Sequence, residues 1–130
     1  MRIHFRNPDR SEQTFGLLVA RTVEEVTRGL SGVAGPWLLN DANADGMIFA
    51  FRRPIRMRMT VRETLMPLHF AFVDDQSVVT RVTRSEPRAA RDLASSVPSR
   101  WIVEVDARKW PIFGVQEGAR LVTLNEDREG

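Results

Sequence analysis

The chain has 130 residues, which is the length of one domain with a single hydrophobic core. It contains no cysteine, and this excludes disulfides, thiol catalysis and thiolate metal sites. The formal net charge is only +2, too small to indicate a nucleic-acid partner by itself, and no apolar run approaches the ~20 residues that span a bilayer.

The N-terminal region, residues 1–13, predicts an edge strand or an arm that reaches a neighbouring chain, because Ile3 and Phe5 alternate with polar residues. Its first ten residues lack the apolar core of a signal peptide. Residues 14–20 predict a strand. Residues 22–25, Thr-Val-Glu-Glu, have the spacing of a capping box and predict a short helix that ends near a glycine. The following segment, 31–44, is rich in Gly, Pro, Asn and Asp and predicts a loop.

Residues 45–75 are the region around which the domain is expected to be organised, as three consecutive strands. In the segment 55–60 apolar residues alternate with arginine and threonine, which indicates a strand with one dry and one wet face. Residues 68–73 are almost wholly apolar and predict a strand that is buried on both faces.

Further strands are predicted over 78–84, 101–105 and 120–124, and Asp106 can cap a short helical turn within 107–113. Pro111 limits that helix to about one turn. Many short strands with little helix favour a mainly β domain, a sandwich or barrel, over 14–124. Residues 125–130 form a charged C-terminal tail.

An ordered set of motifs resembles the bacterial family called domain of unknown function 192. The resemblance covers about Phe15 to Leu124 and implies a compact, mainly β, jelly-roll-like domain with a short helix near its start. Members are mostly exported proteins without an established biochemical role. The motifs are Thr22–Glu25, Arg28–Leu30, Asp45–Phe51, Thr64–Leu68, Ala71–Asp74, Val103–Val105 and the glycines Gly114 and Gly118.

The chain departs from the family at polar positions. Where members usually have Trp-Met-Lys-Asn-Thr, this sequence has residues 60–64, Thr-Val-Arg-Glu-Thr. His69 replaces an aspartate, and Ala119 stands where a glycine-aspartate turn is usual. The export signal is absent as well. A small-molecule site made by those family groups is therefore expected to be altered or lost.

The strongest local feature is a series of arginines on the predicted central strands. Such a stripe can bind phosphates or an acidic protein surface; the alternative is a solvated face neutralised by nearby carboxylates. A nucleic-acid partner is not favoured, because aromatic side chains are not interleaved with the arginines. A protein partner stays open, since arginine is enriched at interfaces. The series is Arg52, Arg53, Arg56, Arg58 and Arg62.

A second candidate is a ligand-binding or hydrolytic pocket on the wet face of the central sheet, lined by Arg62, Glu63, Thr64 and His69. Glu63 and His69 could act as an acid–base pair; the alternative is a half-buried histidine and an unrelated surface carboxylate. Two histidines without H-x-x-x-H spacing do not predict a metal site. No nucleophile, phosphate-loop or dinucleotide motif is present, so neither enzymatic activity nor a cofactor is expected.

Three tryptophans could line a ligand cleft. Trp101 begins an apolar strand and Trp110 follows in the predicted helical turn, so both are expected in the core. Trp37 lies in a polar segment and is expected to contact something outside the domain.

The function predicted from these features is a non-catalytic structural or accessory β-domain that docks onto a larger protein assembly. The family framework persists while its polar positions have changed, which favours packing over chemistry. A bacteriophage capsid decoration (cement) protein bound to a major capsid protein would fit, and self-association is also compatible. The expected location is the cytoplasm or a virion, with neither nucleic acid nor a membrane as partner. The alternative is the small-ligand or hydrolytic pocket domain.

Overall fold

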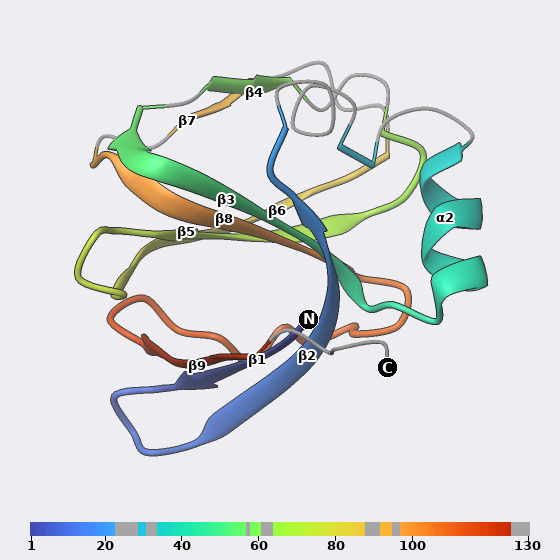
Figure 1. Ribbon diagram of the computed structural model, residues 1–130. Coiled ribbons are helices and arrows are strands. Elements are labelled where there is room, and N and C mark those ends of the chain that lie inside the picture. The colour runs from blue at the N-terminus through green and yellow to red at the C-terminus, as the bar shows by residue number, and fades with distance from the viewer. Residues whose placement is uncertain are drawn as a thin grey trace.

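The computed structural model describes residues 1–22, 29–30, 34–56, 58–60, 64–87, 92–94 and 97–125. Within them lie one short helix and nine strands (Figure 1). Their bounds are β1 (Arg2–Arg6), β2 (Glu12–Ala20), α2 (Ala34–Ala42), β3 (Gly46–Ile55), β4 (Arg58–Thr60), β5 (Leu68–Val73), β6 (Val79–Ser85), β7 (Asp92–Ala94), β8 (Ser99–Asp106) and β9 (Arg120–Asn125).

Seven strands form one sheet in the order β6-β5-β8-β3-β2-β1-β9, and β4 pairs with β7 in a small second sheet. The large sheet is mixed, because β2 and β3 run parallel while its other neighbours are antiparallel. It curls into a half-barrel that brings the β1–β2 and β9 region opposite β5 (Figure 1). The mainly β prediction is confirmed. The arrangement is a single curled layer and is not clearly a jelly roll.

One corner of the half-barrel is held closed by backbone hydrogen bonds between the two edge strands. Val79 N–H donates to the Ala119 carbonyl at 2.8 Å, and Leu121 N–H donates to the Ser77 carbonyl at 2.8 Å. These bonds place the start of β6 against the start of β9, so the natural twist of the sheet returns it upon itself.

The curled sheet separates two hydrophobic cores, because successive side chains of a strand point to opposite faces. The inner core fills the half-barrel, and the outer core lies between the sheet and α2 and β7. The inner core comprises Ile3, Phe5, Phe15, Leu17, Ile48, Ala71, Val73, Val79, Val103, Val105, Phe113, Val115, Ala119 and Leu121. The outer core comprises Ala20, Leu30, Leu39, Ala44, Met47, Phe49, Met66, Leu68, Phe70, Phe72, Leu93 and Ile102.

Two of the three central strands lie where they were predicted, as β3 and β5. The segment 55–60, predicted as one strand, is divided: β3 ends at Ile55, and β4 pairs with β7 outside the large sheet. Every residue of β5 is buried, as expected for an apolar strand covered on both faces. β3 approaches β8 so closely that a Cβ on Gly46 would lie 1.8 Å from the Glu104 carbonyl oxygen. Glycine is therefore required at the start of β3.

Two predictions need correction, and the predicted single C-terminal turn is confirmed. The segment predicted as a loop over 31–44 contains α2, which accommodates Pro36 in its first turn, where a missing N–H costs little. β1 lies between β2 and β9 rather than at an edge, because β9 comes from the far end of the chain. The C-terminal helix is one turn, in which Trp110 N–H donates to the Asp106 carbonyl at 3.0 Å. The helix predicted after residues 22–25 lies outside the described residues.

Candidate functional site

The arginine series lies at the end of β3 that is farther from α2, and it continues into β4 (Figure 1). The side chains of Arg52, Arg53, Arg56 and Arg58 are exposed, as predicted. Within the part of the chain that the structure describes, no carboxylate lies within ion-pair distance of Arg52, Arg53 or Arg56. Among the described residues, therefore, no ion pair neutralises these three arginines. Arg62 lies outside the described residues.

A large bulge in β3 sets the position of two of these arginines. β3 pairs with β8 at Ala50–Trp101 and again at Ile55–Ser99. Four residues of β3, 51–54, therefore lie opposite a single residue of β8, Arg100. We call residues 51–54 the β3 bulge. Bulges re-aim side chains and often occur beside functional sites.

Arg100 adds a further positive charge across from the β3 bulge. Its guanidinium carbon lies 5.5 Å from the ring centroid of Trp101, and its Nε lies 3.8 Å from Asp75 Oδ1. The Asp75 side chain is 60% exposed, so water screens this pair and it neutralises Arg100 only weakly. We call Arg52, Arg53, Arg56 and Arg100 the basic end of the sheet.

The predicted pocket is not assembled by the described residues. His69 is buried on the inner face of β5, where its Nε2 donates to the Trp110 carbonyl at 2.7 Å and its ring stacks on Phe113 at 5.0 Å between centroids. Burial is the main cause that lowers the pKa of His69. The expected wet-face position of His69 is therefore wrong, because β5 is covered on both faces. Thr64 is buried, and Glu63, like Arg62, lies outside the described residues.

Trp37 is 64% exposed on α2, as its predicted outward position requires. It does not join the arginines, because α2 precedes the start of β3 whereas Arg52 lies roughly 20 Å further along that strand. Trp101 and Trp110 are partly buried and pack against the inner core, which confirms the prediction for both.

Two buried carboxyl groups on β8 were not predicted as candidates. Glu104 is 5% exposed and faces the outer core, in register with Met47 and Phe70. Within the described part of the chain its Oε2 has no hydrogen-bond partner, and burial raises the pKa of the carboxyl group to about 8. Asp106, two residues further along the same face, is fully buried. The sequence signal was a glutamate inside an apolar strand, Trp101–Val105.

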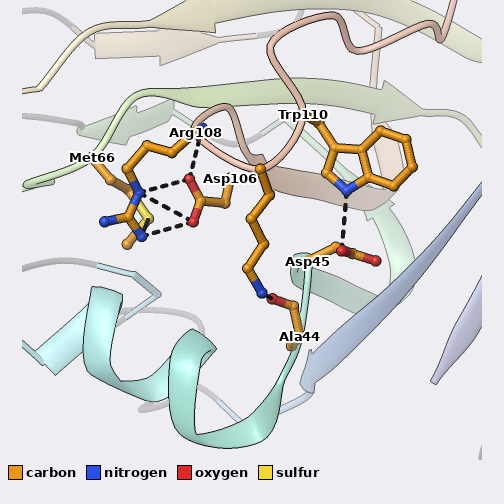
Figure 2. Close-up of polar contacts among 7 residues, drawn as sticks. Ala44, Asp45, Met66, Asp106, Arg108 and Trp110 are labelled. Carbon is orange, nitrogen blue, oxygen red and sulfur yellow. Dashed lines mark hydrogen bonds and ion pairs between the residues drawn. The ribbon is translucent and has the colours of Figure 1, made fainter.

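Asp106 belongs to a set of contacts that fastens the turn after β8 to the junction of α2 and β3 (Figure 2). Arg108 Nη2 lies 2.7 Å from Asp106 Oδ2, Lys109 Nζ donates to the Ala44 carbonyl at 2.8 Å, and Trp110 Nε1 donates to Asp45 Oδ1 at 3.0 Å. Although burial alone would raise it, hydrogen bonds from Arg108 and its charge hold the pKa of Asp106 below its ordinary value. These contacts therefore stabilise the fold, with Asp106 buried and Arg108 and Lys109 exposed at the surface.

The described ranges contain no group of three or more histidine or carboxylate side chains placed to hold a metal ion. Among the same residues, no helix has the length and apolar character needed to cross a bilayer.

The chain is similar to known proteins at the level of family and fold. Residues 5–123 match the model of the DUF192 family, described as uncharacterized ACR, COG1430. No curated protein matches the chain. One similar crystal structure is of a Sinorhizobium meliloti protein provisionally described as a transcription regulator, with 18% identity, a TM-score of 0.74, and coverage of 94% of this chain and 93% of that one.

A second similar crystal structure is of a protein of unknown function from Novosphingobium aromaticivorans. It has 20% identity and a TM-score of 0.69, and the match covers 93% of this chain and 84% of that one. At such identities the similarity establishes the fold alone. Neither protein is described as part of a capsid, so the comparisons give no support to the expected capsid role.

Proposed function

The chain belongs to the DUF192 family, and from the geometry of its basic end we propose that it is a non-catalytic domain that docks onto an acidic surface of a protein assembly. The observation that carries the proposal is the exposure of Arg52, Arg53 and Arg56 without an acidic neighbour among the described residues. Guanidinium groups bind carboxylates in a two-pronged geometry, and arginine is enriched at protein interfaces.

Two of the buried titratable groups, His69 and Asp106, support a non-catalytic role. His69 donates to a backbone carbonyl inside the inner core, and Asp106 is bound by Arg108. Neither is positioned to exchange a proton with a solvent-borne substrate. A bacteriophage capsid is one assembly of the proposed kind, and the domain would then decorate the major capsid protein.

A small-ligand pocket on the outer face is the alternative function. One observation favours it: Glu104 Oε2 is buried without a hydrogen-bond partner. Such groups are rare in folded proteins and often mark sites where a polar ligand completes the hydrogen bonding.

The docking proposal can be tested by affinity purification from the organism that encodes the chain. The variant R52E/R53E/R56E reverses the three arginines, and R2E/R10E/R120E makes the same change in charge at three exposed arginines away from the β3 bulge. We expect the wild type and the second variant to recover the same assembly, and the first variant to lose it. Binding of the purified partner should weaken as salt increases.

Two results would overturn this proposal. One is recovery of the same partner by R52E/R53E/R56E at wild-type yield. The other is a wild-type protein that remains monomeric and is found in no assembly. Recovery with virions would identify the assembly as a capsid.

A further inference from the structure

Among the described residues, the backbone at the basic end includes a strand edge that no other strand pairs with. β2 pairs with β3 only as far as Ala20–Phe49, whereas β3 continues to Ile55. Beyond this last pair, no described strand lies in register along the edge of β3 that faces β2. The open edge over residues 50–55 is about 20 Å long, which is enough for an extended segment of five or six residues.

An open edge of this kind is normally protected in a folded protein. Here part of the protection is present, since Pro54 lacks an N–H and the flanking side chains are arginines. Arginines discourage pairing with most strands but favour pairing with one that carries carboxylates. The charges thus select which strand can be added.

We propose that this open edge of β3 binds an extended acidic segment of a protein partner, which pairs with the backbone beside the β3 bulge while its carboxylates bind Arg52, Arg53 and Arg56. The inference rests on the proposed docking function and specifies the part of the partner that binds. Strand addition supplies main-chain hydrogen bonds, and the bidentate guanidinium–carboxylate contacts supply selectivity.

The chemistry of the site favours an acidic polypeptide over a nucleic acid. Single-stranded nucleic acids bind basic surfaces mainly where aromatic rings are free to stack on bases. Both aromatic residues at the bulge are engaged elsewhere: Phe51 packs against the outer core and Trp101 against the inner core.

The first experiment measures binding of fluorescent octaglutamate by anisotropy at low salt. We expect R52Q/R53Q to weaken binding by about tenfold or more, while R2Q/R120Q, which removes two exposed arginines on β1 and β9, changes it by less than about threefold. R52K/R53K should fall between the two, because lysine retains the charge but not the two-pronged geometry.

A second measurement tests the backbone component. Octaglutamate should shift the amide NMR signals of Arg52 and Arg53 and slow their hydrogen exchange, because strand addition engages main-chain groups. The inference is overturned if octaglutamate does not bind, if R52Q/R53Q binds as the wild type does, or if the amides beside the bulge are unaffected. It is also overturned if a single-stranded DNA of equal charge binds more tightly through the same arginines.

These outcomes are separable from those of the affinity purification. If octaglutamate fails to bind but the native assembly is still lost in R52E/R53E/R56E, docking through the basic end stands and strand addition is wrong. If octaglutamate binds as expected but no assembly contains the protein, the docking function fails while the acidic-segment site stands.

Discussion

His69 and Glu104 lie on neighbouring strands, β5 and β8, yet they are buried on opposite faces of the sheet under opposite conditions. On the inner face, His69 stacks on Phe113 and donates to the Trp110 carbonyl. On the outer face, Glu104 lies in register with Met47 and Phe70, and its Oε2 has no partner. The His69 ring is thus hydrogen-bonded within the fold, whereas Glu104 Oε2 has no partner among the described residues.

This difference indicates where the domain can be altered with gain and where only with loss. A buried polar group that is hydrogen-bonded contributes to stability, whereas one without a partner retains the full cost of its desolvation. Removal of a compensated group on the inner face should therefore destabilise the domain. Replacement of the ionisable carboxyl group of Glu104 should stabilise it at a pH where the unfolded chain would ionise.

The largest effect is expected for Glu104→Gln. The folded-state pKa of about 8 lies above the ordinary glutamate pKa of 4.5, so the unfolded chain ionises first as pH rises. The stability contributed by the protonated group is complete below about pH 4.5 and is lost as pH rises to about 8, by at most about 5 kcal/mol. Glutamine cannot ionise, so the variant should be more stable at pH 8 by a few kcal/mol in urea titrations.

The same variant provides its own internal control at pH 4. There the wild-type glutamate and the glutamine of the variant are both neutral, so the difference in the free energy of unfolding should nearly vanish. Glu86→Gln is the matched surface control, since Glu86 is exposed and pairs with Arg84 at 2.7 Å. It should change stability by less than about 0.5 kcal/mol at either pH. A Glu104→Gln variant that is less stable than wild type at pH 8 would contradict the interpretation of Glu104 as an uncompensated carboxyl group.

The next largest effect is expected for Asn7→Ala, which removes a hydrogen-bonded polar side chain beside the inner core. Asn7 Nδ2 donates to the Gly114 carbonyl at 2.7 Å and to Ser11 Oγ at 2.9 Å, and its Oδ1 accepts from Gln116 N–H at 2.9 Å. Alanine leaves these groups unpaired and frees the loop that packs Phe113 and Val115 inward. We expect a loss of roughly 2–4 kcal/mol in thermal or urea unfolding.

Asn40→Ala is the control for the Asn7 variant, because Asn40 is exposed on α2. Alanine is the better helix former, so this change should be neutral or slightly stabilising. Equal losses for the two variants would show that the contacts of Asn7 with the 114–116 loop do not stabilise the domain.

Much of the sheet could be predicted because its signals are local. The period-2 pattern of the central region and the apolar run of β5 follow from the alternation of side chains. The exposure of Arg56 follows from the same pattern, whereas two adjacent exposed arginines, Arg52 and Arg53, do not. The position of β1 could not be predicted, since its pairing with β9 depends on residues more than a hundred positions away. α2 was missed because Gly35 and Pro36 also fit a loop.

Only part of the candidate site could be predicted from the sequence, for a similar reason. The arginines are evident, but the bulge that displays them arises from a mismatch in which four residues of β3 oppose one of β8. No local pattern encodes that mismatch. His69 was placed on a wet face because the sequence does not show that the 110–113 segment crosses over β5. Glu104 was passed over because its neighbours in space come from two other strands.

The smallest effect is expected for His69, and it sharpens the comparison because its sign is opposite to that of Glu104. Burial is the main cause that lowers the pKa of His69 from 6.5; the charge of Arg84 lowers it further, while the Trp110 carbonyl and Glu86 oppose the shift. The stability that neutral His69 contributes is therefore present above pH 6.5 and is lost as pH falls through the folded-state value. In wild type the opposite slope from Glu104 masks this loss.

The Glu104→Gln background exposes the histidine. There, stability should decline as pH falls from 7.5 to 5, and a further His69→Gln change should flatten that decline whatever its cost in packing. An NMR titration of the His69 ring in the folded protein should give a pKa below 6.5. A value at or above 6.5, or a decline that survives His69→Gln, would mean that the inner face does not hold its histidine neutral and that the two faces differ less than their hydrogen bonding indicates.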